Sequence, residues 1–527
     1  MAHLGAGLML KHAASLLTLC ILFLLAGLLP AAISLFSTLS DGPALTSFIT
    51  GFNLRAFFNT MVMGLAVGLS ACVAGFTIAY TIVNTKGFAS KTARTIFPIA
   101  LFAPSVMPAI GLIYLIGNNG LIIQTPLYGA TGVFLGALVF TLPHATLQLL
   151  LSLERLDAGL ILAARSLRAS PLKGFLTIIL PHCRAGLINA FLIAFVLTVT
   201  DFGVPKLLGG NFSMLATEIY NQAIGNQDWA AAGFLSLWLM LPCILAFYFT
   251  SKYPMTVAQA GDIPARPFSE HPIGWSIAAW LFLIFEASCV LVVIYGSFVT
   301  FWPYVPEMTL ANYSFKNSTY GIDPWINSFV LATSVAAIGT IVSFVGAYLT
   351  RRVKNIPPAL TKLFSATALL PLCIPGTVLG LAFALAFSGC SIFASATGAM
   401  TLLVFNTLIH LYTVAHITAG NTFSQIDPRY ETVGESLGVS PLSTIRLVIL
   451  PLCKTGLGEV FCYLFASALT TISAVVFLYT PETMPAAVAA IQMIDSGFIS
   501  EGAAMSTLIF VSALAVRMIV LKISQTK

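Results

Sequence analysis

The chain has 527 residues, of which 58% are hydrophobic and only 8% are charged, and its formal net charge is +6. A water-soluble domain covers its surface with roughly 25% charged residues. The composition therefore excludes a soluble globular protein, and the mean hydropathy of +0.96 indicates a chain that lies mostly within a lipid bilayer.

Apolar segments follow one another along the whole chain. A helix needs about 20 apolar residues to cross a bilayer, and its backbone groups must be hydrogen-bonded within the segment. The segments lack the alternation of roughly ten-residue barrel strands. We expect an all-α membrane protein with about twelve transmembrane helices, at 14–38, 57–83, 95–117, 129–152, 185–204, 229–250, 275–302, 325–350, 363–388, 395–420, 456–479 and 503–522.

The first segment also resembles a signal-peptide core, because it is Leu-rich behind Lys11. Its apolar stretch runs on to Phe36, which is too long for such a core. We therefore expect it to be retained as the first span.

Basic residues give the orientation, because cytoplasmic loops are enriched in Lys and Arg. With the N-terminus inside and alternating loops, all but three of the 24 basic residues are cytoplasmic, and the exceptions are Arg55, Lys206 and Lys316. We expect a multi-pass membrane protein with both termini in the cytoplasm. The positive charge is then explained by topology and implies no nucleic-acid partner.

The chain contains an internal repeat. Residues 156–187 align without a gap to 426–457, with twelve of 32 positions identical, and 59–80 resemble 327–348. Such self-similarity indicates a duplication. Six predicted spans separate equivalent points, so both halves share one orientation, and a pseudo-two-fold axis would run along the membrane normal.

The repeat predicts the domain organisation. We expect an N-terminal half, 1–252, with a cytoplasmic hairpin at 157–183, and a C-terminal half, 274–527, with a hairpin at 427–453. A polar, proline-containing linker, 253–273, would join them in the cytoplasm. A translocation path would lie on the axis between the halves.

The second hairpin has clear start and stop signals. Asp427 and Pro428 are typical of an N-cap followed by proline at the first helical position. Gly438 predicts a left-handed helix end, and Ser440 with Pro441 begins a second helix by the same device. The sequence therefore predicts a short helix, a sharp corner and another helix.

The first hairpin repeats these signals with Asp157, Ser170 and Pro171, but Arg168 stands where the corner glycine is expected. A non-glycine residue in the left-handed region costs about 1–2 kcal/mol. We therefore expect this corner either to be strained or to close differently.

Both hairpins carry apolar side chains that a solvated connection would not need: Leu160, Ile161, Leu162, Leu167, Tyr430, Val433 and Leu437. They face either the rest of the protein or a partner. A plain tie between two spans is the alternative. The stronger similarity of the hairpins than of most spans favours partner docking.

The hairpins resemble the signature loop of binding-protein-dependent ABC permeases, which reads Glu-Ala-Ala, three residues, Gly, nine residues, Ile, one residue, Leu-Pro. The matching positions are Ala163, Ala164, Ile178, Leu180, Pro181, Gly438, Val448, Leu450 and Pro451. Leu162 and Thr432 stand where the motif has Glu, and Glu431 comes one residue early in the second copy.

This resemblance implies a type I ABC importer fold of two six-helix permease repeats, located in a bacterial inner (cytoplasmic) membrane. The hairpins would be coupling helices, seated on an ABC ATPase homodimer in the cytoplasm. It also implies a periplasmic substrate-binding protein and surrounding lipid as partners, with ATP-Mg on the ATPase and no cofactor on this chain. The candidate coupling residues are Ala163, Ala164, Leu167, Arg168, Pro171, Leu180, Pro181, Glu431, Leu437, Gly438, Pro441, Leu450 and Pro451.

Double-length permeases of this kind resemble the iron(III), thiamine and 2-aminoethylphosphonate group of importers. The stretch TDFGVPK at 200–206 and the residues at 209–220 are most similar to permeases assigned to 2-aminoethylphosphonate. The resemblance implies that compound, or a related small anion or zwitterion, as substrate, with iron(III) or thiamine as alternatives.

Prolines interrupt one predicted span in each half: Pro104 and Pro108 recur as Pro371 and Pro375. Broken helices often line a path, although a simple kink is the alternative. Together with two acidic residues, Asp201 and Glu286, these prolines are our candidates for the translocation path.

Acidic residues inside apolar spans are expensive and therefore suggest function. Glu286 is mid-span, and either a polar contact or a path residue fits. Glu459 is near a cytoplasmic span end, where we expect it either to snorkel to the interface or to pair with Lys454. The outer loops 205–228 and 480–502 are polar and acidic, which suits either a docking site for a binding protein or plain solvated loops.

Other chemistry is not indicated. The chain has no GxxxxGK[ST] phosphate-binding loop, no metal-ligand spacing and no nucleophile–base pattern, so we expect no enzyme activity. An ion-coupled secondary transporter is the competing function, but the loop after the second span lacks the acid typical of the major facilitator class. Three small-residue pairs predict close helix packing: Gly64/Gly68, Gly132/Gly136 and Gly376/Gly380.

Overall fold

The computed structural model describes residues 2–38, 51–84, 97–253, 273–316, 318–319, 321–353, 356–387 and 389–525. The predicted linker 253–273 lies outside the described residues except for its two ends. Several basic residues used to predict the orientation also lie outside them, namely Lys86, Lys91, Arg94, Arg266, Lys354 and Lys527.

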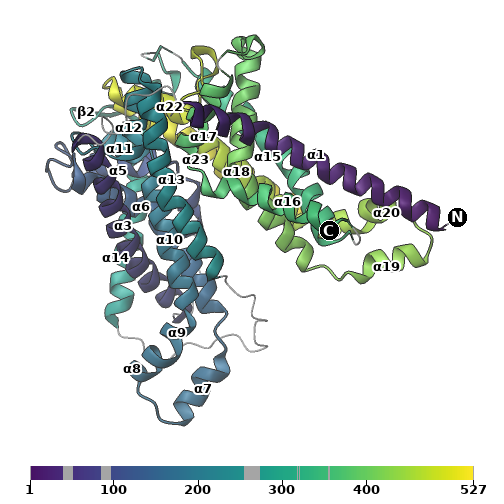
Figure 1. Ribbon diagram of the computed structural model, residues 1–527. Helices are drawn as coiled ribbons and strands as arrows, with labels where there is room; N and C mark the ends of the chain where they lie inside the picture. Colours follow the sequence, from purple (N-terminus) through teal and green to yellow (C-terminus); the bar gives the residue numbers. More distant parts are fainter. Residues whose placement is uncertain are drawn as a thin grey trace. The chain divides into compact units, whose positions relative to one another are not determined.

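The described chain is almost entirely helical (Figure 1), as expected of an all-α membrane protein. Nine of its helices are long and apolar enough to cross a membrane, or eleven if each of two bent pairs is one span. The nine cover Ala13–Ser37, Asn53–Asn84, Ala130–Glu154, Trp229–Lys252, Gly274–Ser297, Asp323–Arg351, Ala396–Ser424, Pro441–Thr470 and Ile499–Ser524, and the bent pairs are Pro171–His182 with Arg184–Thr200 and Pro358–Cys373 with Gly376–Phe387.

The span predicted at 95–117 has neither a helix nor a bent helix pair of membrane-spanning length among the described residues. It forms the 3-10 helix η1 (Phe97–Phe102) and the short helix α5 (Val106–Ile116), with Pro104 between them. Proline has no N–H to donate and disfavours helical backbone in the residue before it. The interruption predicted at Pro104 is therefore confirmed.

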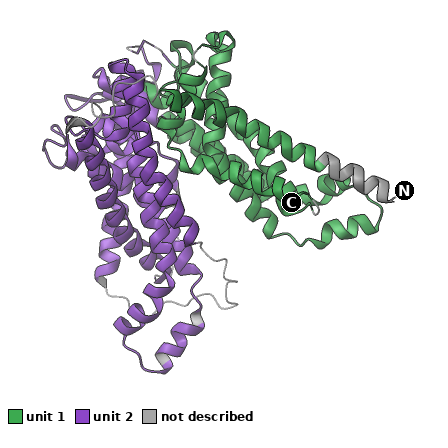
Figure 2. Cartoon of the chain, in the orientation of Figure 1, with its two compact units in different colours: residues 1–41, 322–489, 508–527 green, residues 42–321, 490–507 purple. Residues whose placement is uncertain are grey.

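The chain divides into two compact units that differ from the two sequence halves (Figure 2). Unit 1 comprises residues 1–41, 322–489 and 508–527, and unit 2 comprises residues 42–321 and 490–507. The first helix of each half therefore belongs to the unit formed mainly by the other half. The halves 1–252 and 274–527 are the two copies of the repeat in the sequence. In the structure, the first helix of each half packs with the unit that contains most of the other half.

Unit 2 contains most elements of the first half and the first helix of the second. Its helices are α3 (Gly51–Asn84), η1, α5, α6 (Ala130–Glu154), α7 (Ala158–Ser166), α8 (Pro171–Gly174), η2 (Phe175–Ile179), α9 (Leu180–His182), α10 (Arg184–Thr200), α11 (Gly203–Leu208), α12 (Leu215–Tyr220), η3 (Asn221–Gly225), α13 (Trp229–Lys252), α14 (Ile273–Ser297) and η4 (Ala311–Ser314). Helix α3 packs on α6 and α10, and α14 packs on α3 and α5.

Unit 1 contains α1 (Ala2–Ser37) and most elements of the second half. These are α15 (Asp323–Arg351), α16 (Pro358–Leu369), η5 (Leu370–Cys373), α17 (Gly376–Phe387), η6 (Ser391–Ala394), α18 (Ala396–Ser424), α19 (Arg429–Ser436), α20 (Pro441–Thr444), η7 (Ile445–Ile449), α21 (Leu450–Thr470) and η8 (Pro481–Thr483). Helices α15, α18 and α21 pack on one another, and α1 packs on α16 and α17. Two helices, α22 (Ala486–Asp495) and α23 (Ile499–Gln525), have residues in both units.

Helix α1 illustrates why the chain needs lipid. Leu17, Leu24 and Leu28 are buried along one face, whereas Leu19 and Leu22 on the other sides are 60% and 55% exposed. A helix that is apolar all round is stable when one face packs on protein and the rest contacts hydrocarbon. The sequence therefore places α1 in a bilayer with one packed face.

The three predicted small-residue pairs do mark close packing. A Cβ atom on Gly64 would lie 2.6 Å from the Val199 side chain, and one on Gly68 would lie 2.9 Å from the Phe191 ring, both in α10. In unit 1, a Cβ on Gly380 would lie 2.6 Å from the Ala474 carbonyl oxygen. Small residues let these segments approach closely.

The outer segments differ from the expected loops. Residues 205–228 form α12 and most of α11, and Glu218 is only 3% exposed; within 480–502, Glu501 is 4% exposed. Glu218 lies on α12 and Glu501 in the first turn of α23, and both are buried, so the picture of solvated loops is wrong for these two acids. A small antiparallel pair, β1 (Val299–Phe301) and β2 (Val305–Met308), follows α14 and joins Val299 to Met308.

Candidate functional site

The predicted hairpins form two elbows, which we name by their residues: elbow 1 is 157–183 and elbow 2 is 427–453. In Figure 1, α7 projects beyond the ends of the long helices of unit 2, whereas α19 lies near the N-terminal end of α1 in unit 1. The second helices, α8 and α20, and the π-helical turns that follow, η2 and η7, have equivalent bounds 270 residues apart. The repeat in sequence is therefore also a repeat in local structure.

An aspartate before the first helix of each elbow accepts a hydrogen bond from an N–H of its first turn, although in elbow 2 the N-cap is Pro428 and not Asp427 as predicted. The Asp157 Oδ1 accepts a hydrogen bond from the Gly159 N–H at 2.7 Å, and the Asp427 Oδ1 accepts one from the Arg429 N–H at 2.8 Å. Such bonds satisfy backbone donors that have no partner inside the helix. Helix α19 begins at Arg429, one residue later than the position of Pro428 suggested.

Both corners turn through left-handed backbone. Gly438 has φ 71° and Arg168 has φ 54°. The Val439 N–H donates to the Gly434 carbonyl at 2.9 Å, and the Ala169 N–H donates to the Ala164 carbonyl at 3.0 Å. The two corners therefore close in the same way, and Arg168 adopts a backbone region that costs about 1–2 kcal/mol for a non-glycine residue.

The second helix of each elbow begins with a serine cap followed by proline, as predicted. The Ser170 Oγ accepts from the Lys173 N–H, and the Ser440 Oγ accepts from the Ser443 N–H, both at 3.3 Å. Beyond the elbows the two copies differ. In the first, a 63° bend at Cys183 separates α9 from α10, whereas the second runs straight on into α21.

The two helices of each elbow touch through one residue from each helix. The glycine of this pair is on the first helix in elbow 2 and on the second helix in elbow 1. In elbow 2, a Cβ on Gly434 would lie 2.6 Å from the Thr444 Oγ1, so glycine leaves room for threonine. In elbow 1 the equivalent residues are Ala164 and Gly174, both buried. Each copy therefore has glycine on one side of the contact and a residue with a side chain on the other.

The predicted coupling residues all lie on the elbows. Ala163 and Ala164 are on α7, Glu431 is on α19, Leu167, Arg168, Leu437 and Gly438 form the corners, Pro171 and Pro441 begin α8 and α20, and Leu180, Pro181, Leu450 and Pro451 begin α9 and α21. Their role in coupling stays a prediction.

Each elbow presents exposed apolar side chains, which we call its docking face. Leu167 is 82% exposed and Leu437 is 74% exposed. Equivalent leucines that the sequence analysis did not single out extend both faces: Leu172 is 68% exposed and Leu442 is 76% exposed. Of the apolar residues singled out from the sequence, Ile161 alone points inward, with 5% exposure.

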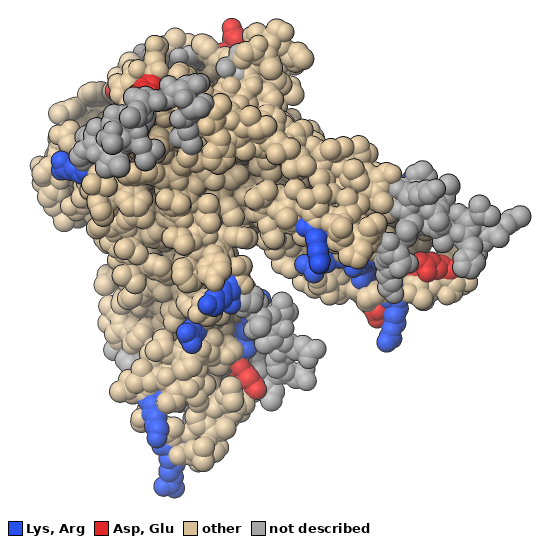
Figure 3. Space-filling model, in the orientation of Figure 1, with Lys and Arg blue, Asp and Glu red and all other residues tan. Residues whose placement is uncertain are grey.

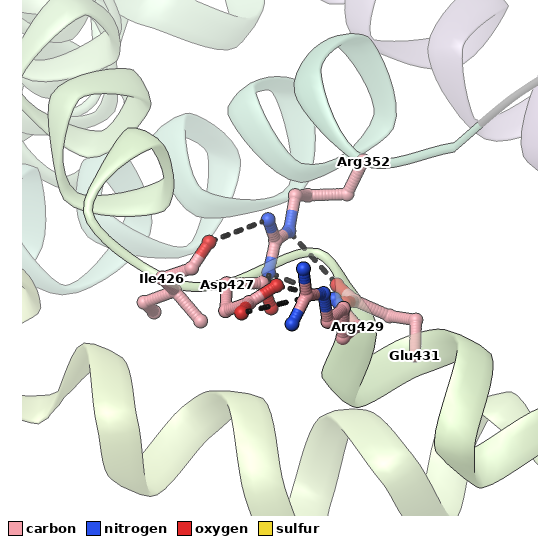
Figure 4. Close-up of polar contacts among 5 residues, drawn as sticks. All are labelled: Arg352, Ile426, Asp427, Arg429 and Glu431. Atoms are coloured by element: carbon pink, nitrogen blue, oxygen red, sulfur yellow. Dashed lines mark hydrogen bonds and ion pairs between the residues drawn. The ribbon is translucent and has the colours of Figure 1, made fainter.

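An arginine fastens elbow 2 to the end of α15 (Figure 4). The Arg352 Nε donates to the Glu431 Oε1 at 2.8 Å, and Nη2 donates to Oε2 at 3.2 Å. The same guanidinium donates to the carbonyl oxygens of Ile426 and Asp427 at 2.9 and 3.3 Å. Sequence reasoning counted Arg352 only as a cytoplasmic basic residue and missed this contact.

The path candidates are buried or half-buried, and they are divided between the two units. Pro104 and Pro108 flank the start of α5 in unit 2, and Pro371 and Pro375 flank a 107° bend between α16–η5 and α17 in unit 1. Asp201 follows α10, and its carboxylate accepts from the Val204 N–H at 2.9 Å, so it caps the start of α11. The role of these residues in a path stays a prediction.

Glu286 lies on α14 with 4% exposure, and neither of its carboxylate oxygens has a hydrogen-bond partner among the described residues. The expected partner of Glu459 is wrong. Its carboxylate pairs with the Arg517 Nη1 at 2.6 Å, from α23, because helix packing brings that residue to it. Both side chains are partly exposed, so this pair contributes little stability.

Charge is distributed as the topology requires. Most of the visible surface carries no charge, and Lys and Arg gather toward the elbow end of each unit (Figure 3). Basic residues near one end of the helices are what the cytoplasmic side of a membrane protein shows.

Comparison with known proteins agrees with this architecture. Residues 71–253 match the family described as "Binding-protein-dependent transport system inner membrane component". The matched residues all lie within unit 2, and over this segment the chain is similar to that family. The matched segment contains α6, elbow 1 and the helices that follow.

Two of the relatives align over most of the chain. It is 26% identical over 494 residues to the ferric transport system permease protein FbpB of Actinobacillus pleuropneumoniae, covering 88% of this chain and 70% of that protein. A putative ferric transport system permease protein FbpB 1 of Haemophilus influenzae is 26% identical, covering 82% and 71%. The spermidine/putrescine permease PotB of Salmonella typhimurium is 26% identical over 220 residues, which cover 38% of this chain and 74% of PotB.

The corner geometry makes a matched pair of substitutions informative. Gly438→Ala places a side chain at φ 71° and should weaken the corner by about 1–2 kcal/mol. Arg168→Gly removes the same strain from the first corner, and the gain is offset by the greater freedom of unfolded glycine. Hydrogen exchange should therefore accelerate around residue 438 in the first variant and stay unchanged or slow around residue 168 in the second. Equal acceleration by both would contradict this account.

The exchanged pair at the elbow contact predicts compensation. Gly434→Ala should destabilise elbow 2 by about 1–3 kcal/mol, because the new methyl group overlaps Thr444. Adding Thr444→Gly recreates the combination of elbow 1. The loss of stability of the double variant, measured by hydrogen exchange of α19, should be smaller than the sum of the losses in the two single variants. Strict additivity would show that the two positions do not compete for volume.

Proposed function

We propose that this permease is the membrane subunit of an ATP-driven importer, and that a separate ATPase grips its two elbows. The observation that carries the proposal is the pair of docking faces, built at equivalent positions with Leu167 and Leu437 almost fully exposed. The elbow end of each unit carries the Lys and Arg side chains, and exposed apolar residues stand out there. Exposed apolar surface of this kind marks a protein interaction site. A pair of equivalent faces suits a dimeric partner.

The energy source is proposed to lie outside this chain. The sequence has no phosphate-binding loop for ATP. A partner that closes on ATP would move both elbows, and the elbows continue into membrane-spanning helices, α10 and α21. A periplasmic binding protein is proposed to deliver the cargo on the opposite side.

The cargo is proposed to be a small polar solute or ion. The relatives that align over most of the chain are named as ferric permeases, and this supports ferric iron as the leading substrate. The similarity of residues 200–206 to 2-aminoethylphosphonate permeases covers a short stretch only, and none of the relatives named above carries that substrate in its name. Thiamine is a further alternative from the same group of importers.

A negative charge on the docking face of elbow 2 should strongly reduce transport. Leu437→Asp puts a carboxylate into an apolar interface, where an unpaired buried charge costs several kcal/mol, so ATP-dependent uptake should fall at least about tenfold. Uptake is measured in cells that express the complete transporter, with ferric iron first and 2-aminoethylphosphonate second.

Ser436→Asp is the matched control, because it adds the same charge to the neighbouring exposed polar position of α19. It should leave uptake largely intact. Normal uptake in Leu437→Asp with normal membrane insertion would contradict docking through this face. Uptake on an ion gradient without any ATPase would exclude the proposed energy source.

A further inference from the structure

Elbow 2 is fastened to its unit by charge. Four hydrogen bonds join Arg352 to Glu431, Ile426 and Asp427, and the Arg352 side chain is only 5% exposed. Arg352 immediately follows α15, and its own N–H closes that helix on the Tyr348 carbonyl at 2.9 Å. One side chain therefore connects the first turn of α19 to the end of a membrane-spanning helix.

Elbow 1 is fastened at the equivalent place by apolar contact. The repeat aligns Glu431 with Ile161 and Arg352 with Asn84. Ile161 is buried in a cluster with Phe76 and Tyr80 of α3, and with residues of α6 and η2. The Asn84 Nδ2 donates instead to the Tyr80 carbonyl of its own helix at 2.8 Å.

The two attachments have the same location and opposite chemistry. Helices α3 and α15 are equivalent in the repeat, and each carries the same aromatic pair near its end: Phe76 with Tyr80, and Phe344 with Tyr348. Elbow 1 adds an isoleucine to this aromatic surface, whereas elbow 2 adds an ion pair beside it. A bidentate arginine that also binds two carbonyl oxygens fixes direction as well as distance.

We propose that Arg352 is a positioning residue that holds elbow 2 on α15, and that Ile161 holds elbow 1 on α3. This inference rests on the proposed coupling function of the elbows. It follows that the two elbows of one chain fail under different changes: elbow 2 when either charge is lost, and elbow 1 when apolar volume is lost.

The first test needs only the full-length permease in lipid nanodiscs and no partner. In Arg352→Met, which keeps the side-chain volume, hydrogen exchange of α19 should accelerate at least about tenfold, since removing one partner of a buried ion pair is strongly destabilising. Exchange of α7 should not change. Ile161→Ala should give the reverse pattern. Exchange of α19 within twofold of the parent protein in Arg352→Met would overturn the proposal.

A transplant tests the chemistry itself. Arg352→Asn combined with Glu431→Ile installs the residues of elbow 1 in elbow 2. The double variant should recover slow exchange of α19 relative to Arg352→Asn alone, because no unpaired carboxylate remains. A double variant no better than the single change would contradict the equivalence. If Arg352→Met does not insert, Glu431→Gln decides the same question, since it keeps the arginine and removes the carboxylate.

Uptake with the ATPase and binding protein present separates this inference from the proposed function. ATP-dependent uptake should fall at least about tenfold in Arg352→Met and recover in the transplant. If the parent protein shows no ATP-dependent uptake, the proposed function fails, and hydrogen exchange still decides how the elbows are fastened. If the parent protein is active and Arg352→Met transports normally, the positioning role alone fails.

Discussion

A short helix outside the membrane can move the membrane-spanning helices only if it is fastened to them. In this protein the inward side of each elbow supplies that attachment: Ile161 in the apolar cluster of unit 2, and Glu431 on Arg352 in unit 1. The outward side is left apolar and exposed at Leu167 and Leu437. An element that is fixed on one side and uncovered on the other is suited to transmit a partner's movement.

The bilayer imposes the second constraint, because every backbone group inside it needs a partner. Helices α10 and α21 both end in extended backbone at equivalent residues, Asp201 with ψ 138° and Thr471 with ψ 136°. In the first copy, the carboxylate of Asp201 accepts hydrogen bonds from the N–H groups of Gly203 and Val204, which begin the next helix, α11. In the second copy, Asn406 donates to the Ala474 carbonyl at 2.7 Å. Irregular backbone is thus tolerated where side chains of the same unit satisfy it.

The sequence was sufficient where local chemistry decides the structure. The hydrogen bonds accepted by Asp157 and Asp427 and the corner at Gly438 follow from short-range rules, and the helix class follows from composition. Arg168 was harder: the rules allowed strain or another closure, and the corner hydrogen bonds, repeated from the second copy, hold it in the left-handed region.

Long-range contacts were beyond the sequence. No local sequence feature indicates that α1 and α14 each pack with the other half of the repeat. An apolar helix can pack on many other apolar helices, so its sequence does not identify its partner. The pairing of Arg352 with Glu431 was missed for the same reason, and so was that of Glu459 with Arg517. The repeat held a usable signal: the two charged residues of one copy are replaced together by Asn84 and Ile161 in the other.

Site-specific photocross-linking is the most direct test of the elbows as handles for a separate motor. A photoreactive residue at position 437 or 167, in membranes that contain the whole transporter, should link to the ATPase subunit. The same residue at lipid-facing Leu19, which is 60% exposed, should not. Links from both elbows to the ATPase are the predicted result. Links from 437 and 167 that reach only other parts of this chain, in a transporter that imports its cargo, would contradict the account.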